Sequence, residues 1–150
     1  LNSNTISEIT CRNHKIFLLN FSRYNSKGKQ NGCAIEVFQS NHEGAIIDRI
    51  QDAYFDGTEG IVINPGAYTH YSYAIRDALA SIEVTKVEIH ISDITKREEF
   101  RKVSVTAPAC DAQIYGHGLE GYLEAIDFCL KSALFLRTRL LCPVLHAETQ

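Results

Sequence analysis

The sequence predicts one doubly wound α/β domain, in which helices cover both faces of a parallel sheet. Short apolar runs typical of strands alternate along the chain with longer amphipathic segments typical of helices. The strand-like runs are apolar at nearly every position, as expected of strands buried on both faces. The chain has 150 residues, enough for one core, and contains no internal repeat or linker that would divide it.

The first half of the chain begins the alternation. Apolar residues recur at near-helical spacing over residues 15–25, which predicts a helix. Two glycines and an asparagine in residues 27–32 predict the turn that ends it. A short apolar run predicts a strand over residues 34–38, and an amphipathic pattern predicts a helix over residues 44–55.

The second half repeats the alternation. A β-branched run predicts a fully buried strand over residues 60–64. A helix is expected over about 71–81 and a strand over 86–91. The last strand is expected over residues 112–115 and the last helix over residues 119–130.

The two ends of the chain fit the alternation less well. Residues 1–14 are mostly polar without a clear period, and the polar first dozen residues predict no signal peptide. The main domain is expected over residues 1–132, and residues 133–150 form a C-terminal extension or tail. Either the last helix continues until Pro143 stops it, or this segment is a loosely docked tail.

Composition excludes several classes of protein. Lysine plus arginine total 15 against 18 for aspartate plus glutamate, a formal charge of −3, whereas nucleic-acid binders usually carry a basic excess. No apolar run approaches the roughly 20 residues that span a bilayer. Five cysteines without C-x-x-C spacing predict reduced thiols in a cytoplasmic protein, not a disulfide framework or a zinc site. We therefore expect no nucleic-acid, membrane or metal partner.

Polar clusters follow the predicted strands. In open α/β sheets the ligand lies beyond the carboxyl ends of the strands. Four clusters, at residues 39–44, 64–70, 90–93 and 116–118, would share one edge of the sheet. Loops of this composition also cap helices, so each cluster alone has a structural explanation. The four together favour a binding crevice.

Glu88 and His90 form the candidate catalytic pair. They lie two residues apart on a predicted strand and therefore point to the same face. A carboxylate beside an imidazole fixes its tautomer and favours its protonated form, which gives a general acid that works near neutral pH. The alternative is a structural histidine at the end of a strand.

Four further side chains are candidate ligand contacts. Asn64 offers an acceptor and two donors to a polyhydroxylated ligand, or fixes its own Pro-Gly turn. His70 binds a hydroxyl or caps the helix that it precedes. Ser92, with backbone N–H groups around it, suits a carboxylate. Arg101 either turns inward to bind an anion or hydroxyl, or belongs with residues 96–101 to a solvated helical face.

Motifs that carry other chemistries are missing from the sequence. It contains no zinc-ligand spacing, P-loop, G-x-G-x-x-G or G-x-S-x-G motif. Metal hydrolysis, phosphoryl transfer, Rossmann dinucleotide binding and α/β-hydrolase chemistry are therefore disfavoured. The residue types predict a cofactor-free acid–base reaction on a small anion.

Several strings of the sequence closely resemble the type II 3-dehydroquinate dehydratases. They are Phe38-Gln-Ser-Asn-His-Glu-Gly44, Ile61-Val-Ile-Asn-Pro-Gly-Ala-Tyr-Thr-His70, Arg76-Asp77-Ala78, Glu88-Ile-His-Ile-Ser92, Arg97-Glu-Glu-Phe-Arg101 and Gly116-His-Gly-Leu-Glu-Gly-Tyr122. The resemblance covers residues 34–131. It implies a flavodoxin-like, three-layer α/β/α subunit in a homo-oligomer, a dodecamer built from trimers. It also implies a cofactor-free, reversible trans-dehydration of 3-dehydroquinate to 3-dehydroshikimate through an enolate, in the shikimate or quinate pathway.

The resemblance assigns a catalytic role to the pair on the strand. By it, His90 donates a proton to the departing hydroxyl and Glu88 orients His90. The backbone at Ile91 and Ser92, together with the Ser92 hydroxyl, holds the substrate carboxylate. No metal or Schiff-base lysine is required.

The remaining roles that the resemblance implies concern the substrate ring and a second subunit. Asn64, His70 and Arg101 hydrogen-bond the ring hydroxyls. Asp77 reaches into the site of a neighbouring subunit, which links assembly to catalysis.

The sequence departs from the family at its N-terminus. The family opens with a strand, a Gly-Pro-Asn-Leu-Asn-like loop and an Arg-Glu-Pro-Glu-Ile-Tyr-Gly-like lid that supplies a catalytic arginine and the tyrosine base. Here we expect the first strand to be absent and residues 1–14 to be a degenerate remnant of the loop and lid, with serine for the arginine and threonine for the tyrosine. Arg12, Arg23 and Tyr24 are the residues available to substitute.

Two other classes of function stay open at this stage. A catalytically silent member of the family would bind the ligand without turnover because the lid arginine and tyrosine are missing. A generic flavodoxin-like module for another small anion would make the matching strings coincidental.

Overall fold

A computed structural model of the chain describes residues 14–19 and 33–141, and within them five strands form one parallel sheet. The sheet order is β2-β1-β3-β4-β5, the flavodoxin-like doubly wound order and the fold class that the sequence predicts. The strands are β1 (His14–Leu19), β2 (Cys33–Phe38), β3 (Gly60–Ile63), β4 (Thr85–His90) and β5 (Ala112–Tyr115).

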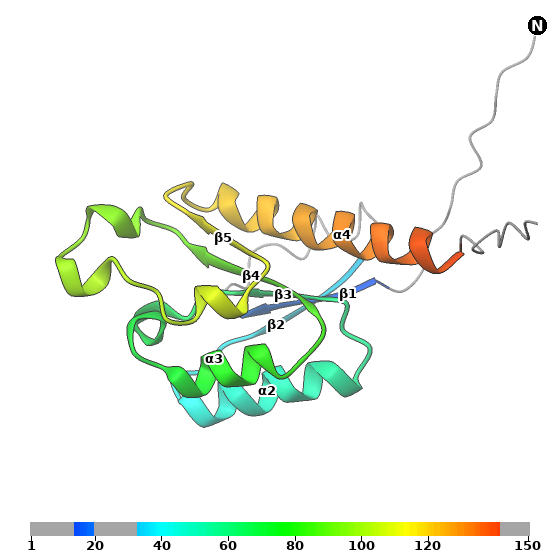
Figure 1. Cartoon of the computed structure of the whole chain (residues 1–150), viewed down its shortest axis with the longest axis horizontal. Helices are drawn as coiled ribbons and strands as arrows, with labels where there is room; N and C mark the ends of the chain where they lie inside the picture. The colour runs from blue at the N-terminus through cyan, green and yellow to red at the C-terminus, as the bar shows by residue number, and fades with distance from the viewer. Residues whose placement is uncertain (1–13, 20–32, 142–150) are drawn as a thin grey trace, which may run out of the picture.

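Helices cover both faces of the sheet (Figure 1). Helices α2 (Glu43–Phe55) and α3 (Tyr73–Ala80) pack on one face, and the long α4 (Glu120–Leu141) packs on the other. The described part of the chain also contains four short 3₁₀ helices in its loops. These are η1 (Gly66–His70), η2 (Ile94–Lys96), η3 (Glu99–Arg101) and η4 (Ala107–Ala109).

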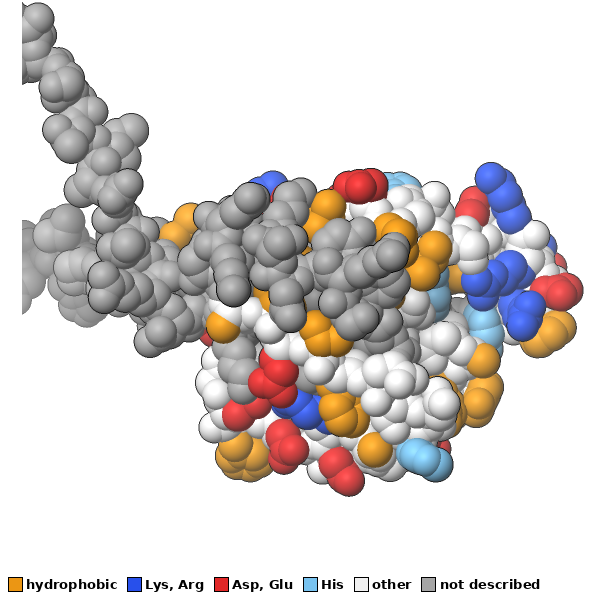
Figure 2. All heavy atoms as spheres, turned by 180° about the vertical axis from the view of Figure 1, so that it is seen from behind, with side chains coloured by type: hydrophobic (Ala, Val, Ile, Leu, Met, Phe, Trp, Pro, Cys, Tyr) orange, Lys and Arg blue, Asp and Glu red, His pale blue; other side chains and the backbone are white. Residues whose placement is uncertain are grey.

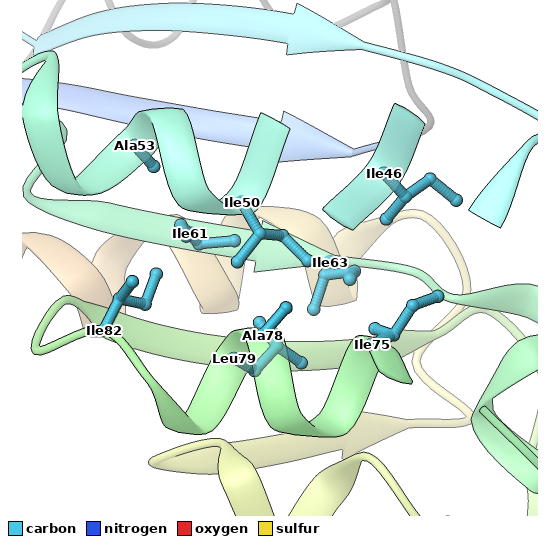
Figure 3. Packing of buried hydrophobic residues seen from close by; sticks show 9 residues of the cluster. All are labelled: Ile46, Ile50, Ala53, Ile61, Ile63, Ile75, Ala78, Leu79 and Ile82. Atoms are coloured by element: carbon cyan, nitrogen blue, oxygen red, sulfur yellow. The ribbon is translucent and has the colours of Figure 1, made fainter. Parts of the chain in front are cut away.

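Alternation along the central strands divides the core into two clusters. On β3, Ile61 and Ile63 pack against α2 and α3, as Figure 3 shows, whereas Val62 packs against α4. Each such fully buried side chain contributes roughly 1.5–3 kcal/mol. On β4, Val87 and Ile89 belong to the cluster under α4. The side chains between and beyond them therefore point to the α2/α3 face, which is the face that the candidate catalytic pair uses.

Residues 14–19 form a strand, so two of our predictions are wrong: the helix over 15–25 does not begin there, and a strand does precede β2. β1 lies between β2 and β3 and pairs with both. Periodicity alone cannot tell whether a short apolar run is a buried strand or a buried helix. Residues 14–19 form a strand because β2 and β3 each offer an edge with which they pair. The rest of the predicted helix lies outside the described residues.

The other predicted elements are confirmed with small shifts of their ends, and α4 is much longer than expected. It continues to Leu141, so residues 133–141 extend the last helix. Residues 96–101 form parts of two 3₁₀ turns instead of one helical face. None of the helices in the described part of the chain has the length and hydropathy needed to cross a bilayer.

The predicted lid remnant, residues 1–14, lies almost entirely outside the described residues, so it stays a prediction. Residues 20–32, between β1 and β2, lie outside the described residues as well. Arg23 and Tyr24 belong to this interval, and Arg12 precedes β1.

Two local contacts fix the helices that flank the site. Ser72 caps α3: its hydroxyl accepts a hydrogen bond from the backbone N–H of Ile75 at 3.0 Å and donates to Glu43 Oε1 of α2 at 2.5 Å. At Gly121, α4 comes so close to the sheet that a Cβ atom would lie 2.6 Å from Ile89 Cδ1.

Candidate active site

The candidate site lies at the carboxyl edge of β3, β4 and β5, where three loops leave neighbouring strands. The register places Ile63 of β3 beside Glu88 of β4, and His90 beside Tyr115 of β5. Asn64 follows β3, and the segment 91–92 follows β4. The sequence-predicted residues at the ends of β3 and β4 therefore meet at one edge, as expected for a doubly wound sheet.

Glu88 and His90 form a buried pair. His90 Nε2 lies 2.7 Å from Glu88 Oε1, and the side chains are 3% and 0% exposed. Because a carboxylate only accepts, Nε2 carries a proton in this contact. His90 Nδ1 makes no hydrogen bond with any described residue, so it is the ring nitrogen available to exchange a proton with a ligand.

Hydrogen bonding keeps Glu88 ionised despite its burial. Burial alone would raise the pKa of Glu88, but hydrogen bonds from His90, Thr106, Gln113 and Ser104 outweigh it and lower the pKa from 4.5 to about 2. The carboxylate is therefore charged at all physiological pH values, and it holds the His90 ring in one orientation.

Asn64 fixes its own turn, the structural alternative that the sequence left open. Its Oδ1 accepts from the backbone N–H of Gly66 at 3.1 Å, and Gly66 has a φ of 61°, which favours glycine. Its Nδ2 donates to the hydroxyl of Tyr122, a fully buried residue of α4, also at 3.1 Å. The amide is thus held rigidly at the end of β3.

His70 has one ring nitrogen engaged and one unpartnered. Its Nδ1 lies 2.7 Å from the Val103 carbonyl oxygen, so Nδ1 donates. Its buried Nε2 has no hydrogen-bond partner among the described residues and is left as an acceptor for a hydroxyl. The alternative role as a helix cap is wrong, because Ser72 caps α3.

The loop after β4 brings cationic groups to the site. The guanidinium of Arg97 donates to the Ser92 hydroxyl. Arg101 lies on the loop surface, where its guanidinium is 3.6 Å from Glu98 Oε2 and 5.9 Å from the centre of the Phe100 ring. Figure 2 shows lysine and arginine side chains gathered at one end of the molecule. This loop therefore offers positive charge to an anionic ligand.

Two further residues that the sequence assigns to the site are Ile91 and Asp77. Ile91 is partly exposed, and its carbonyl accepts from the backbone N–H of Gly118 at 3.0 Å, which ties the loops after β4 and β5 together. Asp77 is exposed on α3, and its side chain forms no hydrogen bond or ion pair in the described part of the chain. The structure does not bring Asp77 to the His90 pair.

Several residues at the site carry no local sequence signal. The groups that hydrogen-bond Glu88 include Thr69, Ser104, Thr106 and Gln113, which lie 16 to 25 residues from it in the chain. Only Gln113 is foreseeable, because the sheet register places it beside Glu88.

A large hollow elsewhere on the surface does not coincide with this site. It has a volume of about 650 Å³ and lies at the opposite edge of the sheet, where β4 begins. Its lining residues are Thr85, Asp111, Phe128, Lys131, Ser132 and Phe135. None of the sequence-predicted site residues borders it.

Comparison with known families identifies the family to which this chain belongs. The sequence pattern of the family described as dehydroquinase class II matches residues 15–130, most of the chain and all five strands. The chain belongs to the class II dehydroquinases. The match includes β1, which agrees with the structure and not with our expectation that the first strand is absent.

Named relatives of this class II dehydroquinase are closely similar in sequence. A 3-dehydroquinate dehydratase of Lachnoclostridium phytofermentans is 70% identical over 101 residues, which cover 67% of this chain and 70% of the relative. One from Thermotoga maritima is 61% identical over 104 residues, covering 69% and 70%. The crystal structure of the type II dehydroquinase of Butyrivibrio crossotus matches with a TM-score of 0.75 at 50% identity, covering 78% of this chain and 97% of that one. The predicted family and fold are confirmed.

Proposed function

We propose that this class II dehydroquinase catalyses the reversible dehydration of 3-dehydroquinate to 3-dehydroshikimate. The observation that carries the proposal is the buried Glu88–His90 pair at the carboxyl edge of the sheet. The names of its relatives support the substrate. The reaction removes a proton beside a ketone and a hydroxyl from the next carbon, so it needs a base, stabilisation of an enolate and an acid.

His90 is the acid for the departing hydroxyl. Nε2–H donates a hydrogen bond to Glu88 and keeps its proton, so a proton carried on Nδ1 is the one delivered. When the carbon–oxygen bond breaks, Nδ1 gives its proton to the leaving oxygen and water departs. In the reverse direction Nδ1 takes a proton from the attacking water.

The segment after β4 binds the substrate carboxylate. The backbone at Ile91 and Ser92 supplies N–H groups, and the Ser92 hydroxyl supplies a further contact. The Arg97 guanidinium that donates to this hydroxyl places a positive charge beside the bound anion, and such a charge-assisted contact is stronger than a neutral one.

The ring hydroxyls of the substrate are bound by three side chains from different loops. His70 Nε2 accepts from one hydroxyl, since Nδ1 donates to Val103. The Asn64 amide, fixed by Gly66, contacts another. Arg101 reaches the ring once it leaves its surface contact with Glu98. This contact is worth little in water, so exchanging it for substrate costs little.

We assign no described residue as the base that removes the α-proton. The sequence candidates lie outside the described residues, and Tyr24 is the phenol among them. A Tyr24→Phe variant tests it: loss of turnover with binding retained supports Tyr24 as the base, and unchanged turnover removes it.

The proposed oligomeric state is based on the resemblance to the family, and the proposed cellular location is based on the cysteines. We propose a homo-oligomer of trimers, a dodecamer, in which the exposed Asp77 of α3 completes a neighbouring site. Light scattering on the purified protein measures the mass directly, and a monomer mass would contradict the proposed assembly.

We propose a cytoplasmic location because the described cysteines, Cys110 and Cys129, are free thiols.

Turnover is tested by following the enone absorbance of the product after 3-dehydroquinate is added. We expect a rise with the wild-type chain and a loss of roughly 100-fold or more in rate with His90→Ala, the usual cost of removing an acid–base group. Calorimetric binding without turnover would favour the silent member of the family. A folded sample that neither binds nor turns over the substrate would refute the proposal.

A further inference from the structure

Three hydroxyl side chains enclose the carboxylate of Glu88. Thr69 comes from η1, whereas Ser104 and Thr106 come from the segment between η3 and η4. Thr69 Oγ1 donates to Oε1 at 2.9 Å, Ser104 Oγ donates to Oε1 at 2.8 Å, and Thr106 Oγ1 donates to Oε2. We call Thr69, Ser104 and Thr106 the hydroxyl cage. Thr69 and Thr106 are fully buried.

A count of protons shows which form of Glu88 the cage accommodates. Five donor groups lie within hydrogen-bond distance of the two oxygens: the three hydroxyls, the Gln113 amide at 2.9 Å and His90 Nε2 at 2.7 Å. A carboxylate only accepts, and its two oxygens offer about four lone-pair sites, so it can engage most of these donors at once. A carboxylic acid would place its own proton against these donors. The cage therefore selects the charged form.

The cage also has a second arrangement available if the charge is lost. Thr69 Oγ1 lies 2.8 Å from Ser104 Oγ and 3.0 Å from Thr106 Oγ1. Either hydroxyl of each pair is able to donate to the other. Without the charge on Glu88, the hydroxyls would bond one another and leave the carboxyl free to turn, and His90 would lose the acceptor that fixes its Nε2 proton.

The two segments that supply the cage are themselves locked together. The backbone N–H of Val105 donates to the Thr69 carbonyl at 2.7 Å. His70, next to Thr69, donates from Nδ1 to the Val103 carbonyl at 2.7 Å. The loop that carries the cage is thus held against the turn that carries a substrate contact.

We propose that the hydroxyl cage consists of positioning residues that act through Glu88 on His90, with Thr106 the most important of them. This inference rests on the proposed function for the role of His90. Thr106 is the one described residue that donates to Oε2, whereas Oε1 has four donors. Removing the Thr106 hydroxyl leaves one carboxylate oxygen in a buried site without a donor, which is costly for a charge.

Apart from His90, whose Nε2 donates to Oε1 and lowers the pKa of Glu88, the other ionisable groups near Glu88 do not account for its charge. They are Lys86 on β4, His70 at the end of η1, Cys110 after η4 and Asp111 before β5. The Lys86 ammonium donates to the Ile82 carbonyl at 2.7 Å and is absent from the groups that lower the pKa of Glu88. Burial, with the nearby Glu88 charge adding to it, raises the pKa of Cys110 to about 12, so this thiol stays neutral.

The test compares Thr106→Val, which removes the hydroxyl at nearly constant volume, with Thr106→Ser, which keeps it. The carboxyl of Glu88 is titrated by ¹³C NMR in full-length protein labelled at glutamate, and its signal is assigned by its loss in Glu88→Gln. This readout is independent of turnover. In Thr106→Val we expect the pKa of Glu88 to rise by about one unit or more. We also expect kcat to fall roughly 10-fold while KM changes less than about 3-fold. Thr106→Ser restores both.

An unchanged titration of Glu88 in Thr106→Val would overturn the proposal, and so would a raised pKa with an unchanged kcat. If the wild-type chain has no turnover, the proposed function fails, while the titration still decides whether the cage sets the charge. If Thr106→Val does not fold by circular dichroism, Ser104→Ala replaces it; a smaller rise in the pKa of Glu88 is expected, because Oε1 keeps three other donors, and an unchanged titration overturns the idea.

Discussion

Because of Glu88, we expect the free energy of unfolding to depend strongly on pH in the acid range. The pKa of Glu88 is about 2 in the folded state against 4.5 ordinarily. A depressed pKa means that the unfolded chain binds the proton first, so its stabilisation is complete above about pH 4.5 and is lost as the pH falls toward 2. The difference corresponds to about 3 kcal/mol, a large share of the roughly 5–15 kcal/mol that stabilises a typical domain. By pH 3, about 2 kcal/mol of this has gone.

The assay is urea unfolding followed by far-UV circular dichroism, from pH 7 to pH 3 at one protein concentration. We expect the wild-type chain to lose about 2 kcal/mol more than Glu88→Gln over this range. The control is Glu83→Gln, at an exposed carboxylate, which should keep the wild-type pH dependence. Parallel loss of stability in wild type and Glu88→Gln would refute the claim that the buried carboxylate is ionised.

Three further substitutions test the packing around the site. Gly121→Ala should lower the free energy of unfolding in urea by about 1 kcal/mol. The clash of the added methyl group with Ile89 destabilises the fold by more than the better helix propensity of alanine stabilises it. A more stable variant would show that Ile89 moves freely. Ser72→Ala should cost about 1 kcal/mol by loss of the α3 cap, and an unchanged midpoint would contradict the capping role. Tyr122→Phe removes a hydrogen bond to Asn64 and should raise KM about 3- to 10-fold with kcat nearly unchanged, whereas an unaltered KM would mean that Asn64 holds its position without it.

The elements that the sequence predicted well are those with strong, uninterrupted patterns. The β-branched run at β3 and the amphipathic pattern of α2 were found nearly to the residue. β1 was misassigned because four successive apolar residues, Ile16 to Leu19, satisfy the helix and strand templates alike. What makes it a strand is pairing with β2 and β3, and pairing between distant segments leaves no local trace.

At the site, too, local spacing was predictable from the sequence, whereas contacts between distant segments were not. The spacing of Glu88 and His90 was enough to place both on one face of a strand, and the structure brings them within hydrogen-bond distance. The hydroxyl cage was not foreseeable, since its members come from two loops that meet only in the folded chain. Arg101 was placed in the site from the resemblance, but here its guanidinium lies beside Glu98 on the surface.

The most direct measurement is a crystal structure of the protein with 3-dehydroshikimate bound. The central claim is that loops leaving β3, β4 and the turns around them converge on one small cyclic acid. We predict the carboxylate of the ligand at Ser92, a ring hydroxyl at His70 Nε2, and His90 Nδ1 facing the carbon from which the hydroxyl departs. A ligand seated in the hollow at the opposite edge of the sheet, or bound with its carboxylate away from Ser92, would contradict the account.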